Sequence, residues 1–143
     1  TNWNGGSDPT RSWAQSTPVD YTTTTLLLNQ SLGYGALNTK AIIDQGNSNT
    51  ATSAAALAAS YSVVVNGTTV NDWFLPAEND WYEVWNQRTV IGFTATGGNY
   101  WSSSSVAQTN GRYFIFSGTG FGGASGMPKG TSNGMYVRPA RAF

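Results

Sequence analysis

The stretch Tyr100-Trp101-Ser102-Ser103-Ser104-Ser105 (YWSSSS) joins two large aromatic residues to four consecutive serines. Aromatic residues are enriched in strands, and serine hydroxyls bond to backbone groups near turns. We therefore expect a strand around residues 100–103, followed by a change of direction. The residues behind this stretch are mostly Asn, Gly, Thr, Ser and aromatics, and helix formers are scarce from residue 97 onward.

Further strands are expected at residues 112–116 (RYFIF) and within residues 135–143 (MYVRPARAF), separated by Gly- and Ser-rich turns. Side chains alternate between the two faces of a strand, so Phe114 and Phe116 are expected inside, with Tyr113 and Ile115 on the other face. The segment that follows is expected to be a loop. Ile115 then lies either on a contact surface or in a second buried layer beneath that loop.

A helix is expected within residues 72–88 (DWFLPAENDWYEVWNQR). Pro76 suits its first turn, acidic residues follow at the positive end of the helix, and Arg88 suits the negative end. Trp81 and Trp85 are four residues apart and share one face, which is typical of core anchors.

Short strands, two short helices and a hairpin are expected in the first half of the chain. Residues 1–25 are expected to be loops with short strands, and residues 26–28 a buried strand. Asn38-Thr39 would cap a helix through residues 40–45, and Thr52 or Ser53 would open a second helix. Residues 63–70 would form a hairpin around Asn66-Gly67. Strands and helices do not alternate regularly, so we expect an α+β fold with short helices on small antiparallel sheets and a loop-rich C-terminal half.

Composition indicates one domain, residues 1–143, and limits its partners. Seven Lys and Arg residues balance seven Asp and Glu residues, and charged residues make up 10% of the chain against about 25% in an average domain. The basic residues are scattered singly, so nucleic acid is not an expected partner. The apolar runs are far shorter than the roughly 18 residues of a membrane span, so no membrane insertion is expected.

The chain has no cysteine and no histidine. Triads built on histidine, thiolate nucleophiles and imidazole-ligated zinc are therefore excluded. Glu78, Asp80 and Glu83 form the one acidic cluster, and a solvated helix face explains them better than a glycosidase pair. We expect no enzyme, no cofactor and no dedicated metal site; calcium bound by backbone carbonyls and Asn side chains stays open.

Residues 99–134 have the Tyr, Ser, Gly and Asn composition of antibody paratopes. Tyr supplies contact area at low entropy cost, and the small polar residues supply adaptable hydrogen bonds. This segment is the candidate binding region.

The motifs DWFLPAENDW, YWSSSS, YFIFSG and YVRPARAF, in this order, resemble the C-terminal domain family of collagen-like surface proteins, over roughly residues 33–143. That family is similar in fold to C-type lectins and in architecture to the sulfatase-modifying factors. The resemblance implies structural hydrogen bonds for Ser102 and Ser103, and a variable part that opens at Ser104 and Ser105.

Two departures from the family pattern matter. Ala77 stands where the family has a capping Ser, so the helix cap must come from elsewhere or be absent. Gly111-Arg112 replaces Ala-Trp before the strand, so Arg112 is expected to face a ligand. The enzymes among the sulfatase-modifying relatives depend on cysteines, which this chain lacks, so their activity does not transfer.

The chain also resembles the variable proteins of diversity-generating retroelements, whose C-terminal region is rewritten at template adenines. The resemblance implies a diversified binding surface for a protein or glycan ligand on a host or neighbouring cell, on a cell surface or virion. Tyr113 and Phe121 would be aromatic anchors and Arg112 a charged donor. The expected ligand-binding residues are Ser104, Thr109, Asn110, Arg112, Tyr113, Ile115, Thr119, Phe121, Ser125 and Met127. The expected scaffold aromatics are Trp73, Trp81, Trp85, Trp101, Phe116 and Phe143.

The alternative is a fixed adhesion, carbohydrate-binding or structural domain of a surface or tail-fibre protein. Ser, Gly and Thr are common in any extracellular loop, so composition alone allows it.

Overall fold

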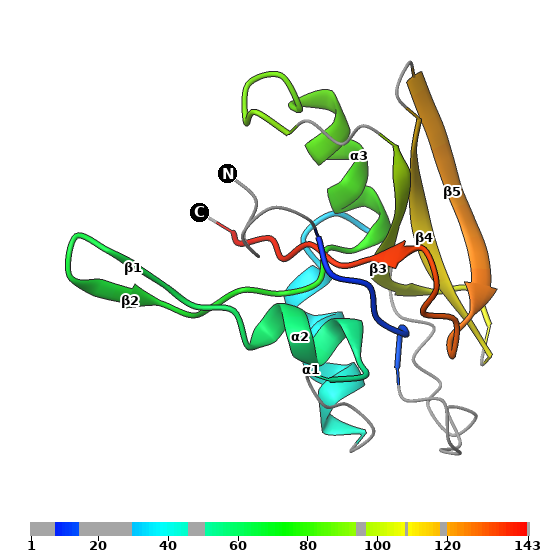
Figure 1. Cartoon of the computed structure of the whole chain (residues 1–143), viewed down its shortest axis with the longest axis horizontal. Helices are drawn as coiled ribbons and strands as arrows, with labels where there is room; N and C mark the ends of the chain where they lie inside the picture. Colours follow the sequence, from blue (N-terminus) through cyan, green and yellow to red (C-terminus); the bar gives the residue numbers. More distant parts are fainter. Residues whose placement is uncertain are drawn as a thin grey trace.

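The computed structural model describes residues 8–14, 30–45, 51–93, 97–107, 109–117 and 120–142, without the side chains of 120–122. The chain has a mixed α/β fold with short helices and two small sheets (Figure 1). The elements are α1 Gly35–Asp44, α2 Ala54–Ala59, β1 Val63–Val65, β2 Thr68–Val70, α3 Glu78–Asn86, β3 Gly98–Ser105, β4 Asn110–Ser117, β5 Gly120–Pro128 and β6 Met135–Tyr136.

The larger sheet has the strand order β5-β4-β3-β6. The pairs β3–β4 and β4–β5 are antiparallel, but β6 pairs with β3 in parallel. The expectation of purely antiparallel sheets was therefore wrong at β6. The chain passes beyond β4 and β3 after β5 and enters the sheet on its far side, where it runs in the direction of β3.

The sheet separates two apolar clusters, as the alternation in β4 predicted. On one face, Phe114 and Phe116 are buried together with Tyr100 and Trp81 of α3, which packs on this face. On the other face, Trp101 packs in a cluster with Trp13, α1 and α2; its buried members are Trp13, Ala14, Ile42, Ala54, Ala55, Ala58, Leu75, Trp101, Met135 and Val137.

The four serines form a bulge in β3. Trp101 pairs with Tyr113 and Ser105 with Gly111, which is four residue steps along β3 against two along β4. Two extra residues in one strand turn its backbone away from the partner strand, and the freed polar groups need other partners. The serines are buried, so the bulge faces the interior.

Other elements supply those partners. The Ser102 carbonyl accepts a hydrogen bond from the Trp13 indole (2.8 Å), and its hydroxyl donates to the Arg112 carbonyl (3.1 Å). The Ser103 N–H donates to the Pro76 carbonyl (2.7 Å), and the Ser104 N–H donates to the Ser102 hydroxyl (3.2 Å). The bulge therefore holds together β4, the N-terminal segment and the approach to α3.

The bulge also caps α3. Ala77 has no side-chain acceptor, and the Glu78 N–H donates instead to the hydroxyl of Ser104 (3.0 Å). The Asp80 carboxylate accepts from the N–H groups of Ala77 (2.8 Å) and Gly33 (2.7 Å). The cap that Ala77 cannot supply thus comes from a serine of β3 and from an acidic side chain in the first turn.

Helix α1 begins earlier than expected. Asn38 and Thr39 were expected as caps, but both are buried inside the helix. Thr39 donates to the Gly35 carbonyl (2.7 Å) and accepts from the Leu75 N–H (2.9 Å), while Asn38 donates to the Ser103 hydroxyl (3.4 Å). Their polar groups are used in tertiary contacts, which outweighs their preference for helix ends.

Two local predictions are confirmed. Ser53 caps α2, because its hydroxyl accepts from the Ala56 N–H (3.3 Å). The strands β1 and β2 form the expected hairpin, with Asn66 at φ 51° and Gly67 at φ 78° in the turn. The hairpin projects away from the rest of the chain (Figure 1).

The expected loop after β4 was wrong, because residues 120–128 form strand β5. Pairing with β4 along most of its length fixes the backbone of this Gly-rich segment. Phe114 pairs with Ala124 and Phe116 with Phe121, so β5 carries one extra residue there. The expected strand at residues 26–28 lies outside the described residues.

We predict that Ser104→Ala lowers the free energy of unfolding by about 1–2 kcal/mol, because the buried Glu78 N–H loses its acceptor. The exposed Ser62 gives the control variant Ser62→Ala, for which a change below about 0.5 kcal/mol is expected. Urea denaturation measures both. Equal stabilities for the two variants would contradict the role of Ser104 as a cap.

Candidate functional site

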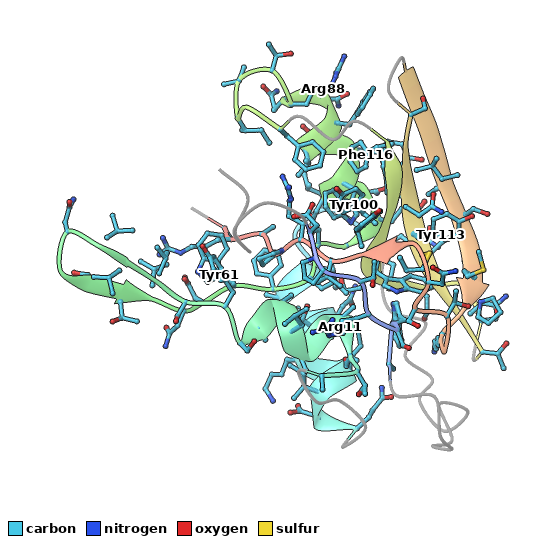
Figure 2. The ribbon with its side chains drawn as sticks, viewed as in Figure 1. Arg11, Tyr61, Arg88, Tyr100, Tyr113 and Phe116 are labelled. Carbon is cyan, nitrogen blue, oxygen red and sulfur yellow. The ribbon has the colours of Figure 1, made fainter. Side chains whose placement is uncertain are left out.

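Side chains of β4 and β5 form one surface on the sheet side opposite α3. Tyr113 pairs with Ser125, and Gly111 with Met127, so these residues and Ile115 point to the same side of the sheet. Tyr113, Ile115, Ser125 and Met127 are half-buried, and none carries a charge. We call these four residues the β4–β5 face. Figure 2 shows Tyr100 and Phe116 beside α3, and Tyr113 farther along the sheet near β5.

The N-terminal segment borders this face. A Cβ atom at Gly111 would lie 2.5 Å from the Trp13 ring, so only glycine allows the indole this close to β4. The ammonium group of Lys129 lies over the Trp13 ring in a cation–π contact, 4.4 Å from the ring centroid. The close contact of Trp13 with Gly111 and the contact of Lys129 with Trp13 therefore fix the end of the face near Met127.

Tyr113 belongs partly to the scaffold. Its ring lies edge-on to Trp101, with 6.2 Å between ring centroids. Tyr113 and Met127 both pack against the Trp101 cluster. Ile115 is not among the apolar residues that pack against either core cluster, so it is the apolar member of the face that the core constrains least.

Arg112 lies on the other side of β4. Its Nε atom is 3.0 Å from Oε2 of Glu78, and its side chain is 26% exposed. The pair links β4 to the N-terminus of α3, where the negative charge of Glu78 is favoured by the helix dipole. Arg112 therefore does not share a surface with Tyr113, contrary to the expectation that the two act together.

The remaining expected site residues are distributed unevenly. Ser104 has no exposed surface and caps α3, so it lies beneath the sheet surface and not on it. Thr109 is exposed and Asn110 half-buried, in the turn and first residue of β4. Thr119 lies outside the described residues, and for Phe121 only the backbone pairing with Phe116 is described.

The acidic cluster on α3 does not act as one group. Glu78 pairs with Arg112, Asp80 binds two backbone N–H groups, and Glu83 is exposed. Within the described ranges, no three acidic side chains gather as metal ligands. These carboxylates are explained by helix capping and one ion pair.

Lys129 is a buried basic group that was not expected from the sequence. It is 6% exposed and follows β5 directly. Burial lowers the pKa of Lys129 to about 8. Its position in an otherwise uncharged segment is the one sequence signal that could have marked it.

Asp8 lies at the centre of a network of ion pairs and hydrogen bonds. Asp8 accepts hydrogen bonds from Nε (3.0 Å) and Nη2 (2.9 Å) of Arg138 and from the Tyr100 hydroxyl (2.8 Å). Burial and the Asp8 carboxylate raise the pKa of Tyr100. The network joins the N-terminal segment, β3 and the C-terminal segment.

A pocket of about 400 Å³ lies between α3 and the C-terminal segment. Its lining includes the aromatic rings of Trp81 and Phe93 and the polar side chains of Glu83, Gln87, Arg138 and Arg141. It combines apolar and aromatic side chains with a few polar groups, the usual composition of small-molecule sites. The pocket involves none of the residues of the β4–β5 face.

No family model, curated protein or solved structure matches this chain. In the part of the chain that the structure describes, no helix has the length and apolar character needed to cross a bilayer.

We predict that the free energy of unfolding rises by about 2 kcal/mol between pH 8 and pH 10 because of Lys129. In this range the unfolded chain keeps the Lys129 proton that the folded chain has lost, so raising the pH favours folding. Above about pH 10 the ionisation of Tyr100 in the unfolded chain works in the opposite direction.

Denaturation at several pH values measures this rise. In Lys129→Met the rise should disappear, and Lys40→Met, which removes an exposed lysine, should retain it. A rise of equal size in all three proteins would show that Lys129 is not its source.

Proposed function

We propose that this chain is a ligand-binding module of C-type-lectin-like fold, and that its β4–β5 face belongs to a diversified surface of the kind found in variable proteins of diversity-generating retroelements. The observation that carries the proposal is the division of β4. Phe114 and Phe116 are buried under α3, whereas Tyr113 and Ile115 stand half-exposed beside Ser125. One strand thus supplies both the core and the contact surface.

The hydrogen bonds that hold the fold support a variable surface. The contacts of the β3 bulge run through backbone groups, through serines and through the Trp13 indole, all of which lie outside the face. Replacing Ile115 or Ser125 removes none of these bonds. A scaffold of this kind accepts many side chains at the face without losing its fold.

The chemistry of the face supports a neutral protein or glycan ligand. Ile115 and Met127 offer apolar contact, Tyr113 offers an aromatic ring with a polar end, and Ser125 adds a hydroxyl. Charged ligands would find no complementary charge among these four residues. In this proposal the module acts outside the cell, on a cell surface or a virion.

The second candidate is a fixed adhesion or carbohydrate-binding domain. The pocket between α3 and the C-terminal segment favours it, because aromatic rings, carboxylate, amide and guanidinium groups meet there, apart from the β4–β5 face. A ligand in this pocket would depend on residues outside the segment 104–127.

We predict that positions 115 and 125 tolerate most substitutions, whereas positions 102, 104, 114 and 116 tolerate few. The first two side chains are half-buried and outside both core clusters, and the other four are buried. A saturation library sorted for resistance to protease measures folding at every position. Equal intolerance at 115 and 116 would show that the face is part of the core.

We predict that natural variation of the encoding gene separates the β4–β5 face from the aromatic residues buried beneath α3. Codons 113, 115, 125 and 127 should vary and codons 114 and 116 should not, with the differences at adenines of a nearby near-copy template. Deep sequencing of a natural population with its flanking DNA tests this. Even variation without a template would overturn the diversified surface and favour the fixed domain.

A further inference from the structure

The two edges of the larger sheet differ. At β6 the edge is closed, because Thr10 forms a bridge with Tyr136 and the Val137 N–H donates to the Pro9 carbonyl (2.9 Å). At β5 none of the described residues forms a bridge with the outer side of the strand. Figure 1 shows β5 as the outermost strand. An open edge presents backbone donors and acceptors to any extended chain.

The register shows which groups point outward. The Lys129 N–H donates to the Thr109 carbonyl (2.9 Å), so these residues form a hydrogen-bonded pair. Such pairs alternate along an antiparallel ladder, so Met127 and Ser125 also direct their backbone groups toward β4. Ala124 and Gly126 direct theirs away from the sheet. Pro128 lies at the next outward position, where it has no N–H to offer.

This edge lacks most of the features that keep strands from pairing. Residues 120–128 include no charged side chain, and the outward residues Ala124 and Gly126 are the smallest available. The bulge between Phe121 and Ala124 and the ring of Pro128 limit the regular part of the edge to residues 124–127. Within that part the strand carries no charge, and the side chains at its two outward positions are a methyl group and a hydrogen atom. Met127 points to the β4–β5 face, and Val106 lies against Gly126, where a Cβ atom would be 2.9 Å from the Cγ2 atom of Val106.

We propose that the ligand of this module is an extended polypeptide that pairs with the outer edge of β5 as a fifth strand. The inference rests on the proposed function and names its ligand class. Backbone hydrogen bonds to Ala124 and Gly126 supply affinity, and alternate side chains of the ligand lie on the β4–β5 face and supply specificity.

The face indicates which ligand side chain fits. Ser125 stands between Tyr113 on β4 and the position of the added strand. Neighbouring strands lie about 4.8 Å apart, so a large apolar or aromatic ligand side chain can lie across the small Ser125 and contact the Tyr113 ring. The preferred ligand therefore carries such a side chain opposite Ser125, with small residues beside it.

A second copy of this chain fits the edge less well. Two β5 strands would place only Ala124, Ser125, Gly126 and Met127 of each copy side by side. Stable protein interfaces use roughly 20–30 residues a side. A glycan matches the edge poorly as well, because its hydroxyls do not repeat at the two-residue period of the outward groups.

The first experiment measures amide hydrogen exchange by NMR in the folded chain. The Ala124 and Gly126 amides should exchange faster than those of Ser125 and Met127. Linear random peptides displayed on phage are then selected on the protein, and an enriched peptide is synthesised. Its binding should slow exchange at Ala124 and Gly126 by at least about tenfold and shift the signals of Tyr113.

A matched pair of variants isolates the backbone donor. Ala124→Pro removes one outward N–H and should weaken peptide binding by about tenfold or more, because a strand hydrogen bond is lost. Ala124 packs against the cluster of Phe114 and Phe116, so the control keeps its size: Ala124→Ser retains the N–H, and its binding should remain within about threefold of the parent. If Ala124→Pro fails to fold, amide exchange of the parent chain with and without the peptide still shows whether the peptide pairs with the outer edge of β5.

Three results would overturn the inference. A bound peptide that leaves the Ala124 and Gly126 amides unprotected would place the ligand elsewhere. Selection of glycans but no peptides on the same protein would exclude a polypeptide ligand, and both of these results leave the proposed function intact. Protection of the same amides by self-association, seen in analytical ultracentrifugation, would make a second copy the occupant. Failure of the proposed function is seen separately, in the codon pattern of the gene.

Discussion

The fold depends on the satisfied bulge in β3. Two extra residues interrupt the ladder with β4, and Ser102, Ser103 and Ser104 bond instead to Trp13, Arg112, Pro76 and Glu78 and to one another. An unpaired buried backbone group would cost on the order of 1–3 kcal/mol, so the partners must be present together. Trp13, Pro76 and the N-terminus of α3 are thereby fixed in position by one short segment.

The elements with strong local signals could be predicted from the sequence. The hairpin follows from Asn66-Gly67, and α2 follows from its Ser53 cap and its alanines. The core role of Phe114 and Phe116 follows from the period of a strand. In each case the local preference and the tertiary contacts agree, which is the condition for a correct prediction.

The elements that were misread owe their conformation to distant partners. Strand β5 consists mainly of residues with weak strand preference, and pairing with β4 fixes it. Asn38 and Thr39 look like caps, but their side chains bond to β3 and to Leu75. Ser104 was expected on the binding surface because sequence spacing does not reveal the bulge. Arg112 was expected there because of its charge, although the two-residue period of a strand places it on the side of Phe114 and Phe116, where it pairs with Glu78.

The pairing of the two chain ends has a consequence for synthesis on the ribosome. Asp8 bonds to Arg138, 130 positions later, and Trp13 bonds to Ser102, 89 positions later. Contacts of such long range slow folding, because a large loop must close before they form. The nascent chain therefore cannot complete its core until residues 135–138 have been made, and the strands β4 and β5 emerge before that closure. The strands β4 and β5 are therefore exposed as unfolded chain for part of synthesis. Because they contain no long apolar runs, they are less prone to aggregate during that time.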